Sequence, residues 1–78
     1  MVYCNLVEKT DHTVTYDFGG MVNDITGRFV FDFKNNHLEI VREPILEMAP
    51  IRHIHSLLRI HQKQFLSGLF KERISYES

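Results

Sequence analysis

The sequence is short of cysteine, proline and tryptophan: it has one cysteine, two prolines and no tryptophan in 78 residues. The single Cys4 excludes a disulfide within the chain. A lone thiol suits a reducing compartment, so we expect a cytoplasmic protein. No apolar run approaches the roughly 20 residues that a membrane-spanning helix needs, so we expect no membrane partner. The chain has room for one domain, residues 1–78.

Charge is unevenly distributed along the chain, although the formal net charge is only −1. Residues 1–47 hold four cationic side chains against eight carboxylates, whereas residues 48–78 hold five cations against two carboxylates. Such a split is typical of a polar contact surface, or of two halves that attract each other when folded.

The N-terminal half has the period-two pattern of β-strands. Residues 2–9 are rich in β-formers, and Val14, Tyr16 and Phe18 alternate with polar neighbours within a predicted strand 13–22. The next strand, 27–33, places three phenylalanines on one face. Between these two strands we favour a turn at 23–27 with a bulge at Gly19-Gly20; the alternative is a longer loop over 19–25.

A hairpin and a helix complete the predicted fold. Asn35-Asn36 tolerates positive φ and favours a tight two-residue turn before a strand at 37–42. Residues 44–49 form a connector, and Pro50 suits the first position of a helix over 50–73, after which the tail from Ser75 should fray. The fold class is therefore α+β, a four-stranded antiparallel meander with one long C-terminal helix packed on one sheet face. The apolar stripe that packs there comprises Ile51, Ile54, Leu57, Leu58, His61, Phe65, Gly68 and Leu69.

Histidines supply the first candidate site. His61 lies within the apolar stripe and is either a hydrogen-bonded core residue or a functional histidine facing a pocket. If it is buried neutral, its pKa falls below about 6.5 and the fold weakens near pH 5–6. His53 and His55 are two apart and point to different sides of a helix, and no pair has the i, i+4 spacing of helical zinc ligands. We therefore expect no metal and no cofactor.

Two helix surfaces are candidate contact sites. Arg52, Arg59 and Lys63 share the outer face, which is either a solvated surface or a nucleic-acid contact. Leu66, Phe70 and Ile74 repeat at i, i+4 and i+8 outside the core stripe, a pattern that favours a homodimer interface. The alternative is that Leu66 and Phe70 meet the connector or the N-terminal strand.

No residue set indicates catalysis. The carboxylates Asp17, Asp32 and Glu39 alternate onto a wet sheet face, where no pocket would shift the pKa of one of them. We therefore expect no enzymatic activity and interpret the chain as a small protein-interaction or accessory module that self-associates through its helix. The alternative is a nucleic-acid-associated regulator that uses the basic helix face.

Overall fold

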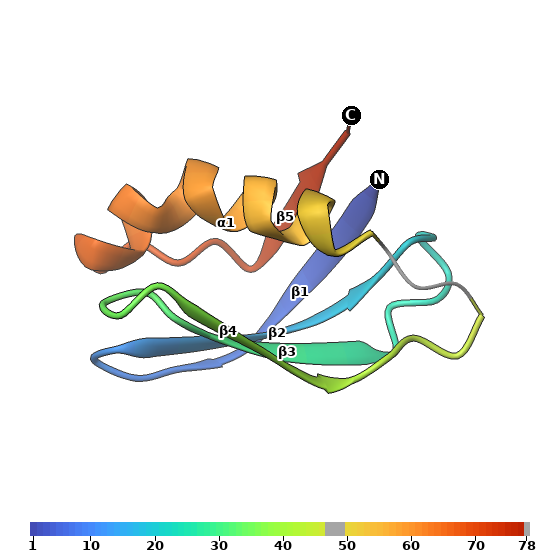
Figure 1. Ribbon diagram of the computed structural model, residues 1–78, viewed down its shortest axis with the longest axis horizontal. Coiled ribbons are helices and arrows are strands. Elements are labelled where there is room, and N and C mark those ends of the chain that lie inside the picture. Colours follow the sequence, from blue (N-terminus) through green and yellow to red (C-terminus); the bar gives the residue numbers. More distant parts are fainter. Residues whose placement is uncertain (47–49, 78) are drawn as a thin grey trace.

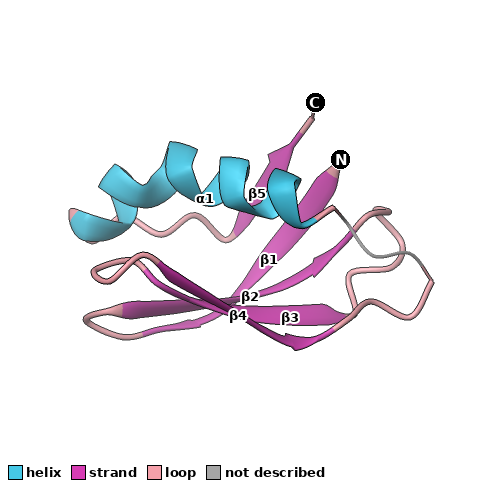
Figure 2. Cartoon of the chain, in the orientation of Figure 1, coloured by secondary structure: helices cyan, strands magenta, loops and turns pink. Residues whose placement is uncertain are grey.

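A five-stranded antiparallel sheet with one helix across one of its faces makes up the fold (Figures 1 and 2). The computed structural model describes residues 1–46 and 50–77. The sheet order is β4-β3-β2-β1-β5, and the α+β class predicted from the sequence is confirmed. In chain order the elements are β1 (Val2–Lys9), β2 (Thr13–Gly19), β3 (Gly27–Asp32), β4 (His37–Arg42), α1 (Ile51–Leu66) and β5 (Arg73–Tyr76).

Aromatic side chains fill the space between the sheet and α1. The alternating residues of β2 and β3 are buried toward the helix, as the period-two pattern predicts. The ring of Phe65 lies at the centre of this layer, 6.2 Å from the ring of Tyr16 and 6.1 Å from that of Phe33, centroid to centroid. The buried apolar residues are Val2, Cys4, Val14, Tyr16, Phe18, Phe29, Phe31, Phe33, Ile54, Leu57, Leu58, Phe65 and Ile74.

The β2–β3 connection is the longer loop. Strand β2 ends at Gly19 rather than at residue 22, and β3 begins at Gly27 and ends at Asp32. The loop folds back so closely that a Cβ atom at position 19 would lie 1.8 Å from the carbonyl oxygen of Asp24. A glycine is required there for backbone approach, so the favoured bulge at 19–20 was wrong. The irregularities in the ladders fall instead between Leu6 and Glu8 and between Arg28 and Phe29.

The β3–β4 turn spans four residues, 33–36, instead of two. Asp32 pairs with His37, and its carboxylate accepts hydrogen bonds from the backbone N–H groups of Lys34 and Asn35. Among the described non-glycine residues, Asn36 alone has positive φ, at 59°. A primed two-residue turn needs positive φ at both positions, so the predicted turn type was wrong while the asparagine at 36 does take the left-handed conformation.

Helix α1 ends at Leu66, seven residues before the predicted end at 73. Gly68 has φ of 87°, the N–H of Leu69 donates to the carbonyl of Gln64 (2.8 Å), and the N–H of Gly68 donates to that of Phe65 (3.0 Å). These two hydrogen bonds with a left-handed glycine form a Schellman motif, which stops the helix. Gly68, counted in the apolar stripe from its spacing, is thus the terminator of the helix.

The chain after α1 returns to the sheet as β5. Tyr16 donates its hydroxyl proton to the carbonyl of Lys71 (2.8 Å), and β5 pairs antiparallel with β1, with Ile74 opposite Cys4. The predicted fraying of Ser75 and Tyr76 was therefore wrong, and the chain ends lie close together because Val2 pairs with Tyr76 (Figure 1). Of the predicted connector at 44–49, residues 47–49 lie outside the described part of the chain.

Candidate functional site

The outer face of α1 carries a straight line of cationic side chains, which we call the basic ridge: Arg52, Arg59 and Lys63. They fall within about 40° of one another around the helix axis at 100° per residue. All three are exposed, whereas the residues on the opposite side of α1 are buried against the sheet. The geometry therefore gives the three residues the shared, solvent-facing side that the sequence predicts.

No negative charge on the helix offsets the ridge. The sequence of α1 contains no aspartate or glutamate, and its three further titratable residues are histidines. Within residues 1–46 and 50–77 the ion pairs link His12 with Asp11, and Arg28 and Arg42 with Asp17, none of which involves the ridge. The ridge cations are thus available to an external anion.

A groove of about 490 Å³ runs along one side of the ridge, between α1 and the β3–β4 hairpin. Its floor includes the buried side chains of Phe31 and Leu58. Gln62 spans the layers by donating its side-chain amide to the carbonyl of Phe33 (3.2 Å). Among the described residues the lining contains cationic, neutral polar and apolar groups but no carboxylate: Phe31, Asn36, Arg52, His55, Ser56, Leu58, Arg59 and Gln62.

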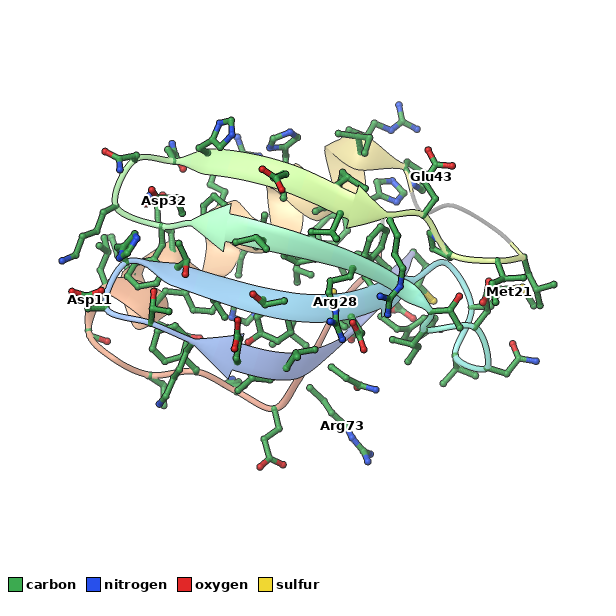
Figure 3. All side chains as sticks on the ribbon, turned by 90° about the horizontal axis from the view of Figure 1, so that it is seen from below. Asp11, Met21, Arg28, Asp32, Glu43 and Arg73 are labelled. Atoms are coloured by element: carbon green, nitrogen blue, oxygen red, sulfur yellow. The ribbon has the colours of Figure 1, made fainter. Side chains whose placement is uncertain are left out.

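The cations on the outer face of the sheet are, in contrast, largely neutralised. Arg28 lies against Asp17, Nε to Oδ1 at 2.7 Å, and this contact raises the pKa of the guanidinium. Arg42 approaches the same carboxylate at 3.8 Å. Figure 3 looks onto this face and shows Arg28 near the middle of it, far from Arg73 at the sheet edge. An anion would find fewer free cations here than on α1.

Two of the three carboxylates considered for catalysis have structural partners. Asp17 is paired with arginines, and Asp32 holds the β3–β4 turn. Hydrogen bonds from the Asn35 side chain and from backbone N–H groups lower the pKa of Asp32. A general acid at neutral pH needs the opposite shift. Glu39 lies in the edge strand β4, opposite Val30, and is exposed to solvent.

The predicted contact stripe is not a helical surface. Leu66 is the last residue of α1 and is 55% exposed, but Phe70 stacks on Phe65 at 5.4 Å between ring centroids. Ile74 lies in β5 and is only 6% exposed. Because the Schellman motif ends the helix between Leu66 and Phe70, the i, i+4, i+8 spacing does not place the three residues on one face. Phe70 packs on the core with the Nζ atom of Lys9 in β1 4.9 Å from its ring centroid, which for this residue agrees with the alternative of a contact with the N-terminal strand.

The histidines also differ from expectation. His61 is half-buried, with its Nδ1 atom 2.9 Å from Oε1 of Gln64 and its ring stacked on Phe65. The buried histidine is His53, 9% exposed, which contacts the N-terminal amine (3.1 Å) and the ring of Tyr76. Burial, the amine and Arg52 all lower the pKa of His53. Within the described residues no group of His, Cys, Asp and Glu could hold a metal ion.

Cys4 and a second hollow are less suited to binding or reactivity than the groove. Cys4 is 1% exposed, and burial raises the pKa of its thiol to about 12, which leaves it protonated and inaccessible. A hollow of about 380 Å³ lined by β1, β5 and the β2–β3 loop has a single arginine as its charged group, so its lining offers less to an anion than the groove does. Its lining residues are Tyr3, Cys4, Asn5, Val22, Ile25, Arg73, Ile74 and Ser75.

Comparison with known proteins adds no functional information. Scans against protein-family models, curated proteins and solved structures each return no match to this chain. In the described residues no helix has the length and apolar character needed to cross a membrane.

Proposed function

We propose that this chain is a small binding module without catalytic chemistry of its own, and that the basic ridge of α1 contacts the phosphate backbone of a nucleic acid. The observation that carries the proposal is the line of Arg52, Arg59 and Lys63 on a helix free of carboxylates, with no ion pair to any residue in 1–46 or 50–77. Phosphates bind such a surface by releasing condensed counterions, a gain that requires cations with no internal partner.

The spacing of the ridge supports contact with several phosphates at once. Arg59 and Lys63 are four residues apart and Arg52 and Arg59 seven, which corresponds to about 6 Å and about 10 Å along the axis. Each long side chain can therefore reach a different phosphate. The groove beside the ridge adds His55, Asn36 and an apolar floor, groups that suit the rest of a nucleotide better than a bare anion.

The proposal includes a cytoplasmic location, where nucleic acid is accessible and the buried thiol of Cys4 would stay reduced. Self-association is a second candidate function. The sequence predicts it through the helix stripe of Leu66, Phe70 and Ile74, whereas the observation that favours it is the open edge of β5.

Salt dependence of binding tests this function. With three phosphate contacts, the affinity for a labelled oligonucleotide should fall roughly 20- to 40-fold between 50 and 200 mM salt, the smaller value for a single strand and the larger for a duplex. Fluorescence anisotropy measures this directly. Arg59→Ala should reduce the slope of log K against log salt by about 0.7 to 0.9.

Lys71→Ala is the matched control, since Lys71 is an exposed cation outside α1 whose side chain forms no ion pair with the described residues. It should leave the slope unchanged. The proposal fails if no binding is detected at 50 mM salt, or if the two variants change the slope equally.

A further inference from the structure

Strand β5 forms one edge of the sheet and was not expected from the sequence. It pairs with β1 on one side only, and no described residue pairs with its other side. An unpaired strand edge exposes backbone N–H and C=O groups that can pair with another chain. Arg73 projects past the edge of β1 in Figure 3.

The direction of the free backbone groups follows from one hydrogen bond. The N–H of Leu6 donates to the carbonyl of Glu72 at 2.7 Å. In an antiparallel ladder, residues that face the neighbouring strand alternate with residues that face away. Glu72 faces β1, so the backbone groups of every second residue after it, Ile74 and Tyr76, also face β1. The backbone groups of Arg73 and Ser75 face outward.

The two edges of the sheet differ in how they are protected. At the other edge, β4 carries an irregularity in its pairing with β3 and is followed by Pro44, two features that discourage pairing with another strand. The β1–β5 ladder is regular, and β5 has no proline and contains the β-favouring residues Ile74 and Tyr76.

We propose that β5 pairs antiparallel with β5 of a second copy of this chain, with Ser75 on the two-fold axis. Opposite residues in an antiparallel pair have side chains on the same sheet face. In a two-fold symmetric pair of identical strands, one residue must therefore lie opposite its own copy on the axis. Centring on Ser75 places Arg73 opposite Glu77 of the second copy, twice by symmetry. In this register the backbone groups of Arg73 and Ser75, which face away from β1, form the hydrogen bonds to the second copy.

The competing register is poorer. Centring on Ile74 places Arg73 opposite Ser75 and Glu72 opposite Tyr76. Its charge pair would be Lys71 with Glu77, but Lys71 lies outside β5, and its carbonyl group accepts the hydroxyl hydrogen bond of Tyr16 inside the fold. In the Ser75 register, Ile74 faces Tyr76 of the second copy on the helix side, where both side chains already adjoin the core. The Ser75 register is therefore favoured, because its cation, Arg73, lies within the strand that pairs.

The two-fold axis of an antiparallel strand pair is perpendicular to the sheet. Both copies of α1 consequently lie on the same face of one continuous sheet, and both basic ridges point to the same side. The dimer does not depend on nucleic-acid binding, because no ridge residue takes part in the β5 contact.

Light scattering coupled to size exclusion tests the dimer, with 9.2 kDa for one chain and twice that mass for the pair. The wild type should be dimeric at high micromolar concentration. Arg73→Glu and Glu77→Arg should each shift the mass toward the monomer, and the double variant Arg73→Glu/Glu77→Arg should restore the dimer by exchanging the charges.

Two further variants separate this surface from the helix. Ser75→Pro removes an outward N–H and should give a monomer with an unchanged circular dichroism spectrum, because proline is tolerated where the N–H faces away from the sheet. Leu66→Glu, at an exposed site on α1, should remain dimeric. A monomeric wild type, a folded double variant that stays monomeric, or a dimer broken by Leu66→Glu and unaffected at β5 would overturn the proposal.

Discussion

Truncation of Phe65 is the most informative perturbation of the fold. The side chain is 2% exposed and its ring contacts those of Tyr16, Phe31, Phe33 and Phe70. Phe→Ala in a core costs about 3–5 kcal/mol. A chain of this length has a total stability of about 4–12 kcal/mol. We therefore expect Phe65→Ala to remove a large fraction of the free energy of unfolding.

Urea denaturation followed by far-ultraviolet circular dichroism measures this loss. Leu66→Ala is the matched control, because the adjacent side chain is 55% exposed and its truncation should change stability by less than about 0.5 kcal/mol. Should Phe65→Ala fail to fold, Phe65→Leu keeps most of the apolar volume and should show a smaller loss. Equal costs at positions 65 and 66 would refute the orientation of α1, since these residues point about 100° apart.

Three other outcomes follow from single buried groups. Tyr16→Phe removes the hydrogen bond to a backbone carbonyl after α1 and should lower the free energy of unfolding by about 1 kcal/mol in urea titrations. Stability should be constant above the ordinary pKa of 6.5 and fall as pH drops below it, because the lowered pKa of His53 makes the unfolded state bind the proton first. His53→Gln should abolish this pH dependence and His61→Gln should retain it; the reverse result would contradict the assignment. Cys4 should react with a thiol reagent only at the rate of unfolding, and rapid labelling of folded protein would show that the thiol is accessible.

The sheet and its buried face could be predicted because each signal is local. Alternation in β2 and β3 depends on neighbouring residues alone, so the inward side chains of Tyr16, Phe18, Phe29 and Phe31 follow from period two. The exposed basic ridge is likewise a consequence of helical spacing. The predicted sheet face of each side chain stays correct even where the predicted strand ends are wrong. Successive residues alternate between the two faces wherever the strand begins or ends.

The end of the helix could not be placed by apolar spacing alone. Leu69, Phe70 and Ile74 continue a helical period, and the Schellman motif at Gly68 overrides it through backbone conformation. The glycine after Ser67 was the available signal. Once the helix ends there, the alternation of residues 73–76 has the pattern of a short strand, with Ile74 buried and its neighbours exposed.

The candidate site was predicted only in part. Arg52, Arg59 and Lys63 follow from the sequence, whereas the groove needs the β3–β4 hairpin beside α1, a tertiary relation that brings Asn36 next to the helix. The open edge of β5 could not be predicted because β5 itself was not predicted. Long-range pairing of β1 with the C-terminal segment has no local signature in either strand.

Nuclear Overhauser contacts of the Phe65 ring test the central claim that α1 packs its aromatic side on the sheet and turns the basic ridge outward. The account predicts cross-peaks from this ring to the rings of Tyr16, Phe31 and Phe33, together with cross-strand contacts between Cys4 and Ile74. Absence of the ring contacts, with sequential amide contacts continuing in helical fashion through residues 67–73, would contradict the packing and the placement of both proposed surfaces.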